Sequence, residues 1–108
     1  MEHLTKTFSA LADETRLGIV EDLIRSGERA AGELVEGSGM SAPAISRHLK
    51  VLREAGLITQ RIDGTKRMYS ARAEGIRAIS DWTVSHKAFW ESSLDRLEEA
   101  LLLDEDDT

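Results

Sequence analysis

The chain has 108 residues, a formal net charge of −6, and 41% hydrophobic and 31% charged residues, which is the composition of one globular domain. It contains no cysteine, so disulfides, thiolate metal sites and thiol redox switches are excluded. No apolar stretch is long enough to span a bilayer, and the N-terminus lacks the basic start and apolar core of a signal peptide. We therefore expect a cytoplasmic protein with no membrane attachment.

The first part of the chain has the periodicity of helices. Leu4, Phe8 and Leu11 recur at helical spacing and predict a short first helix. Asp13 is placed to cap a second helix, and Gly27 is placed to end it. The apolar stripe expected along this second helix consists of Leu17, Val20, Leu23 and Ile24.

Two further helices are predicted on either side of a glycine-rich turn. Residues 30–35 are long enough for a third helix, which Gly37-Ser38-Gly39 breaks. Ser41 then caps a fourth helix, with Pro43 in the first turn, where its missing N–H costs nothing. The apolar stripe of this helix consists of Ile45, Leu49 and Leu52. Two helices joined by a short turn with glycine are the helix-turn-helix signature, here over about residues 30–56.

The period changes after the fourth helix. Residues 57–62 and 66–71 are rich in Ile, Thr and Tyr, and Asp63-Gly64 between them is the strongest short hairpin signal. We expect a two-stranded antiparallel hairpin over about residues 57–71, with Thr65 near its tip.

Helical periodicity returns at Ala73 and continues to about residue 103. We expect one long helix, or two helices if Asp81 caps a new one after a break near Ser80. Its apolar face consists of Ile76, Ile79, Trp82, His86, Phe89, Trp90, Leu94, Leu97 and Leu101. With no internal repeat and no long linker, residues 1–108 are expected to form a single domain, mainly helical, with five to six helices.

Charge is unevenly distributed along the chain. Residues 41–72 hold seven basic and two acidic side chains, whereas the segments before and after them carry net charges of −4 and −7. The basic segment coincides with the predicted fourth helix and hairpin. The alternative is that this clustering arises by chance.

The residues Phe8 to Leu17, Ser41 to Ile58 and Arg61 to Tyr69 closely resemble three motifs of the ArsR family of bacterial repressors. The resemblance implies a winged helix-turn-helix, in which the hairpin is the wing, and a homodimeric repressor that binds an imperfectly two-fold symmetric operator in double-stranded DNA. It also implies a dimer interface made by the first and last helices. The residues assigned to that interface are Leu4, Phe8, Trp82, His86, Phe89, Trp90, Leu94, Leu97 and Leu101; the alternative is that this apolar stripe covers the domain's own core.

The sequence departs from the metal-sensing members of that family. The stretch Gly32 to Glu36 has no cysteine, and near Asp81 only His86 and Glu91 could act as ligands, which is too few for zinc. We therefore predict no metal site and no cofactor, and the chain resembles a cysteine-free branch of the family. An unidentified small-molecule effector could still bind between the last and first helices.

Candidate DNA-binding residues lie on the outer face of the fourth helix and on the wing. They are Ser41, Ala42, Pro43, Ser46, Arg47, His48, Lys50, Arg61, Gly64, Thr65, Lys66 and Arg67. The fork of Arg47 matches guanine O6 and N7, although a phosphate contact is nearly as good an interpretation. Ser41 could serve only as a cap, and His48 could instead be half-buried and bonded to a neighbouring helix. Arg61, Lys66 and Arg67 are expected on the sugar–phosphate backbone or in the minor groove.

Three classes of function are compatible with a chain of this kind. A dimeric repressor is favoured because the basic residues coincide with the helix-turn-helix and wing. A winged-helix module that binds proteins without sequence-specific DNA binding is the alternative, and the acidic flanks would suit it. An enzyme is disfavoured because there is no cysteine nucleophile, no glycine-rich phosphate loop and no clustered histidines.

Overall fold

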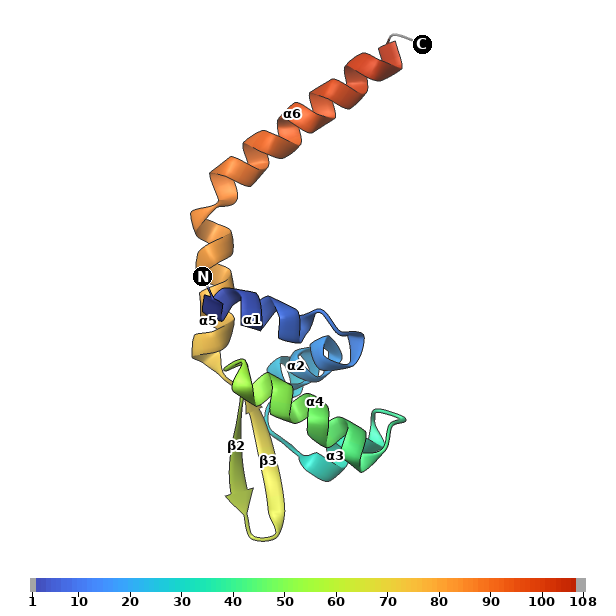
Figure 1. Ribbon diagram of the computed structural model, residues 1–108, viewed down its shortest axis with the longest axis vertical. Helices are drawn as coiled ribbons and strands as arrows, with labels where there is room; N and C mark the ends of the chain where they lie inside the picture. The colour runs from blue at the N-terminus through green and yellow to red at the C-terminus, as the bar shows by residue number, and fades with distance from the viewer. Residues whose placement is uncertain (1, 107–108) are drawn as a thin grey trace. The chain divides into compact units, whose positions relative to one another are not determined.

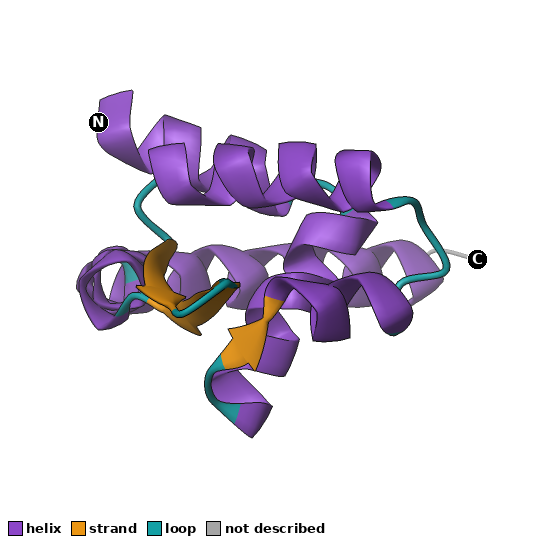
Figure 2. Ribbon diagram, turned by 90° about the horizontal axis from the view of Figure 1, so that it is seen from below, coloured by secondary structure: helices purple, strands orange, loops and turns teal. Residues whose placement is uncertain are grey.

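The computed structural model describes residues 2–106, which form six helices and three short strands (Figure 1). The elements in chain order are α1 (Glu2–Leu11), α2 (Glu14–Ser26), β1 (Arg29–Ala30), α3 (Ala31–Glu36), α4 (Ala42–Glu54), β2 (Ile58–Asp63), β3 (Lys66–Ala71), α5 (Ala73–Ser85) and α6 (Lys87–Asp106). The chain divides into two compact units, the first ending at Ala78 and the second beginning at Ile79. Most of the described residues lie in helices, and β2 and β3 form a hairpin (Figure 2), which confirms a mainly helical winged fold.

The predicted helix boundaries at α2 and α4 are confirmed. Asp13 caps α2, its Oδ1 accepting the amide of Arg16 at 3.0 Å, and Gly27 follows α2 with a φ of 81°, a value that favours glycine. Ser41 caps α4 by accepting the amide of Ala44 at 3.3 Å, with Pro43 in the first turn. These caps are short-range, which explains why the sequence alone locates them.

The hairpin is also confirmed, and the structure adds a third strand to it. The antiparallel sheet has the order β1-β3-β2, because Arg29 and Ala30 pair with Tyr69 and Met68. Pairing of Asp63 with Lys66 leaves Gly64 and Thr65 as the two-residue loop. Gly64 has a φ of 62°, which suits the first loop position of a type II′ turn.

The core of the first unit is built around α4. Ile45, Leu49 and Leu52 are each no more than 2% exposed, as the stripe predicted. They share the core with the turn into β2 and with the wing, chiefly Ala55, Leu57, Ile58 and Tyr69. The start of β2 and Tyr69 of β3 are therefore packed into the same core as α4.

The buried face of α2 differs from the prediction. Ile19, Val20 and Leu23 are buried, whereas Leu17 and Ile24 are 42% and 56% exposed. All five lie on one broad helical arc, and the contacts of α2 with α1, α4 and β3 select the part of it that becomes core. The predicted stripe was therefore wrong at Leu17 and Ile24.

The first helix buries its small side chains. Thr7 and Ala10 of α1 are buried, and Phe8 is 39% exposed. Thr7 satisfies its hydroxyl by donating to the His3 carbonyl at 3.0 Å. Small buried side chains allow close packing of α1 on its neighbours, and the larger apolar side chains are left at the edge of that face.

The C-terminal segment forms two helices, which is one of the two expected alternatives, but the break does not fall near Ser80 and Asp81. Both residues lie inside α5, and the interruption falls at His86. There the Trp82 carbonyl is bound by two side chains: Ser85 Oγ donates to it at 2.9 Å, and His86 Nδ1 lies 2.8 Å from it. The His86 amide donates to Thr83 instead, at 3.3 Å. Local side-chain hydrogen bonds thus compete with the helical ladder and end α5.

Within residues 2–106, no helix is both long enough and apolar enough to cross a membrane.

Candidate nucleic-acid interface

The outer face of α4 carries polar and cationic side chains. Ala42, Pro43, Ser46, Arg47 and Lys50 are all exposed, because Ile45, Leu49 and Leu52 fix the opposite face against the core. Within the described part of the chain, neither Arg47 nor Lys50 forms an ion pair. This face can therefore meet an anionic surface without first breaking an internal contact.

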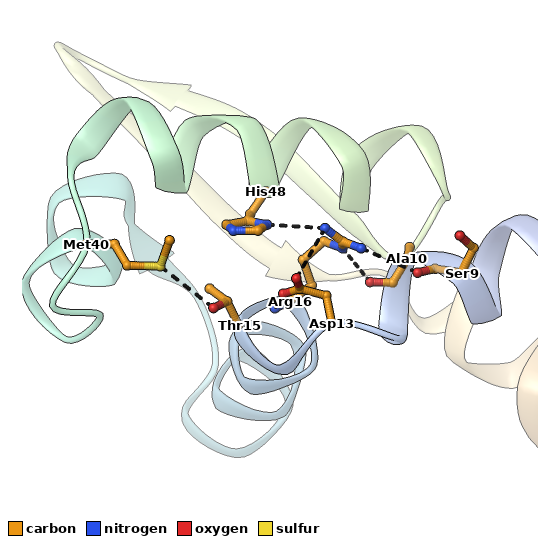
Figure 3. A network of polar contacts seen from close by, with 7 residues as sticks. All are labelled: Ser9, Ala10, Asp13, Thr15, Arg16, Met40 and His48. Atoms are coloured by element: carbon orange, nitrogen blue, oxygen red, sulfur yellow. Dashed lines mark hydrogen bonds and ion pairs between the residues drawn. The ribbon is translucent and has the colours of Figure 1, made fainter.

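His48 lies at the edge of this face and is held by Arg16. Arg16 Nη1 lies 3.3 Å from His48 Nδ1 (Figure 3), and because a guanidinium can only donate, the ring nitrogen is the acceptor. The same guanidinium donates from Nε to the Ala10 carbonyl at 2.6 Å and lies 3.8 Å from Asp13. Arg16 thus joins the C-terminal end of α1 and the start of α2 to α4. The sequence left two alternatives for His48, a DNA contact or a bond to a neighbouring helix. In the structure His48 is half-buried and contacts Arg16 of α2.

The N-cap beside this network is ionised at ordinary pH. The hydrogen bond from the Arg16 amide lowers the pKa of Asp13, and the positive charge of Arg16 lowers it further. A carboxylate at the N-terminus of α2 also interacts favourably with the helix dipole.

The wing brings together the other cationic candidates. Gly64, Thr65, Lys66 and Arg67 are exposed at or beside the loop. Lys66 and Arg67 form no ion pair with any described residue. Lys66 lies close enough to Glu33 to help lower the pKa of that carboxyl, after larger effects of the Ala30 amide and Arg29.

Arg61 differs from the other wing cations because it already has a partner. Its Nε and Nη2 donate to the two carboxylate oxygens of Glu28, at 2.7 and 2.6 Å. Ser70 donates to the same carboxylate at 3.3 Å. The two hydrogen bonds from Arg61 lower the pKa of Glu28, which in turn raises that of Arg61. We name this arrangement of Glu28, Arg61 and Ser70 the wing-root clamp.

Sequence reasoning missed Glu28 as the partner of Arg61. Glu28 lies in the loop before β1, 33 residues from Arg61 along the chain. No motif marks it, and only the pairing of β1 with β3 brings this loop to the wing. The one clue in the sequence is position: Glu28 directly follows Gly27, the glycine that ends α2.

The predicted dimer residues fall in both units. Leu4 is half-buried and Phe8 is 39% exposed on α1. In the second unit Trp82 is half-buried, its ring 4.9 Å from that of His86, and Phe89 lies edge-on to Trp90 at 5.2 Å. The exposed apolar positions along α6 include Phe89, Trp90, Leu94, Leu97 and Leu101. Nothing in the described second unit covers this stripe.

No metal-binding group is found among residues 2–106, since no three His, Asp or Glu side chains come together there. His86 and Glu91 are both exposed near the start of α6. Glu91 lies 3.9 Å from Lys87, an ordinary pair one helical turn apart.

Comparison with known proteins supports the winged-helix interpretation. Residues 13–60 match the family model described as bacterial regulatory protein, arsR family. The chain is 38% identical over 95% of its length, and 92% of the relative's, to the HTH-type transcriptional regulator Rv2034 of Mycobacterium tuberculosis. It is 30% identical to the transcriptional repressor SdpR of Bacillus subtilis, over 76% of this chain and 90% of that one.

A solved structure agrees with these sequence relatives. The crystal structure of an ArsR family transcriptional regulator superposes with a TM-score of 0.75 at 31% identity, covering 84% of this chain and 93% of that one. Fold, motifs and sequence therefore agree over most of the chain. The chain belongs to the ArsR family of bacterial regulatory proteins, and it is a winged-helix transcriptional repressor rather than an enzyme.

Proposed function

We propose that the protein acts as a homodimer on a pseudo-palindromic DNA operator in the cytoplasm. Each subunit places the N-terminal half of α4 in the major groove and the wing on the backbone or in the minor groove. Two recognition helices about 34 Å apart would then read half-sites one helical turn apart.

One observation carries this proposal: four exposed cations without an ion pair among the described residues lie on the predicted recognition helix and at the wing tip. Arg47 and Lys50 on α4, and Lys66 and Arg67 on the wing, form no ion pair within residues 2–106. By contrast Arg29 is tied to Asp22 and Glu33, and Arg72 to Glu74. Phosphate contacts dominate the affinity of such proteins for DNA, and these four exposed side chains lie on the elements that the proposal places against DNA.

The residues differ in the role we assign to them. Arg47 contacts a base, since its fork can bind guanine O6 and N7, and Lys66 and Arg67 contact phosphates. Ser46 donates to a base edge or phosphate, and Ala42 and Pro43 pack on apolar groups such as a thymine methyl. With about four phosphates neutralised per subunit, the slope of log K against log salt is roughly −7 for the dimer.

Dimerisation is supported by the apolar stripe on α6. Trp90, Leu94, Leu97 and Leu101 follow one another at spacings of four, three and four residues, the pattern of a helix that packs along another helix. They are each between 46% and 62% exposed. A contiguous apolar stripe of this kind marks an interaction site, and a second copy of the chain supplies a matching stripe.

The test is selection of bound fragments from genomic DNA, followed by affinity measurements on the recovered operator. Arg47→Ala should relax base preference, with a loss of roughly 1–3 kcal/mol on the operator and little on random DNA. Lys66→Ala should weaken binding to all sequences alike and reduce the salt slope by about one per contact. Recovery of no preferred sequence would contradict the proposal and favour the protein-binding module instead.

A further inference from the structure

A groove lies between the helix-turn-helix and the wing. It has a volume of about 320 Å³ and is lined by α3, α4 and β3. In the first unit α3 contacts both of the other two elements. This volume falls at the lower end of the range for small-molecule sites, about 300–1,000 Å³. We name it the wing groove.

The inner wall of the wing groove is apolar and comes from the core. Ile45 and Leu49 contribute from α4, Val35 from α3 and Tyr69 from β3. Ile45, Leu49 and Tyr69 are at most 4% exposed, so this wall is rigid and already formed. The Tyr69 hydroxyl donates to Gln60 Oε1 at 3.2 Å. Tyr69 therefore offers the groove the apolar face of its ring and not its hydroxyl.

The polar side chains of the groove lie at its rim and are hydrogen-bond donors. Ser46 and Arg67 line it, and neither has a hydrogen-bond or ion-pair partner among residues 2–106. No acidic side chain is among the described residues that line the groove. The larger hollow between α2 and α3 is different, because Glu14, Asp22 and Glu33 line it and its Arg29 is already paired with two of them.

We propose that the wing groove binds a small organic anion with an apolar body, such as a low-mass aromatic or aliphatic carboxylate. The apolar body lies against Val35, Ile45 and Leu49. The carboxylate accepts hydrogen bonds from Arg67 and Ser46, and an arginine fork matches a carboxylate in a bidentate manner.

Occupancy of the wing groove would oppose DNA binding. This step rests on the proposed function, in which Ser46 and Arg67 contact the operator. A carboxylate held by the same two donors competes directly with phosphate for them, so a ligand of this class acts as an inducer. The site differs from the effector position expected between the terminal helices, because every wall of it belongs to the first unit.

The binding experiment uses the full chain without DNA and a matched pair of probes. Benzoate carries both the apolar ring and the carboxylate, and benzyl alcohol carries the ring without the charge. Methyl resonances of Val35, Ile45 and Leu49 are followed by NMR during titration with each probe. We expect saturable shifts with benzoate at roughly millimolar affinity, which is what so few heavy atoms can supply, and at least about tenfold weaker binding of benzyl alcohol.

Three variants separate the contributions to binding. Val35→Phe fills the groove and should abolish the benzoate shifts, whereas Val51→Phe, at an exposed position of α4 outside the groove, should leave them unchanged. Arg67→Gln should weaken benzoate about tenfold and leave benzyl alcohol unaffected. Equal binding of the two probes, or benzoate shifts that persist in Val35→Phe, would overturn the proposal.

A DNA measurement keeps the two proposals distinguishable. Operator affinity of the ligand-free protein tests the proposed function by itself, and benzoate binding without DNA tests the groove by itself. If both hold, saturating benzoate should lower operator affinity of the wild type and not of Val35→Phe. Benzoate that binds in the groove without affecting operator affinity would overturn the inducer role.

Discussion

The wing-root clamp predicts that Glu28 limits the affinity of the wing for DNA. Arg61 donates to both carboxylate oxygens of Glu28. To bind a phosphate, Arg61 must therefore either leave Glu28 or divide its hydrogen bonds between Glu28 and the phosphate. Glu28→Gln removes the negative charge with little change of shape. We expect this variant to bind DNA more tightly at low salt, with the largest gain on random sequences, where phosphate contacts supply nearly all of the affinity.

The size of the effect follows from the number of cations released. Each subunit gains one cation that is no longer neutralised, and a dimer gains two. The slope of log K against log salt should then steepen by about 1.8, at about 0.9 per phosphate contact. Between about 50 and 200 mM salt, the variant should lose about tenfold more affinity than the wild type loses over the same range.

The assay is fluorescence anisotropy with labelled operator and random duplexes at several salt concentrations. Glu21→Gln is the matched control, because Glu21 is exposed on α2 and forms no ion pair with any described residue. Arg61→Gln in the Glu28→Gln background should return the slope to the wild-type value. A slope that is unchanged or shallower in Glu28→Gln, with weaker operator binding, would refute this reasoning and show that Glu28 holds Arg61 in its DNA-binding position.

Three further predictions concern the fold and the assembly. Gly75→Ala should destabilise the protein by about 1–3 kcal/mol in urea unfolding, because a Cβ at Gly75 would overlap the Gly56 carbonyl oxygen, whereas Gly18→Ala, with open space around its Cβ position, should be neutral or stabilising. Asp13→Ala should lower Tm at neutral pH. Because the folded-state pKa of Asp13 is lowered, the stabilisation by Asp13 is complete above the ordinary pKa of about 3.9 and is lost as the pH falls further. A Tm difference between variant and wild type that does not shrink as the pH falls below about 3.9 would argue against a charged cap. Leu94→Glu should shift sedimentation towards the monomer and abolish operator binding, while Ser92→Glu on the same helix should do neither; a dimeric Leu94→Glu would exclude α6 as the interface.

Much of the fold around the candidate interface could be predicted because its signals are local. For α4, the cap at Ser41, the proline at position 43 and the stripe from Ile45 to Leu52 all indicate the same helix, and such agreement between independent signals makes a prediction firm. The signal for the hairpin is also local, since Gly64 determines a two-residue turn. The family resemblance adds the order of these parts.

The features that escaped prediction depend on contacts between distant segments. The strand β1 has only two residues, and its pairing with β3 joins segments about 40 positions apart. Ile19 and Leu17 both lie on the broad apolar arc of α2, so periodicity does not tell which of the two is buried. Packing against the neighbouring elements decides it. The break at His86 escaped because nothing in the periodicity shows that Ser85 and His86 would bind the Trp82 carbonyl.

The acidic total charge and a DNA-binding role are reconciled by the way the cations are paired. Arg16 and Arg61 are tied to carboxylates or carbonyls, and the carboxyls of Glu28 and Glu33 have lowered pKa values, so they are ionised throughout the physiological range. Carboxylates at the wing root repel phosphate wherever the docking geometry is imperfect. In the proposed function, attraction comes from the cations on the outer face of α4 and at the wing tip, which reach the backbone together only when both elements dock. The same −6 that disfavours indiscriminate binding therefore sharpens the contrast between the operator and other DNA.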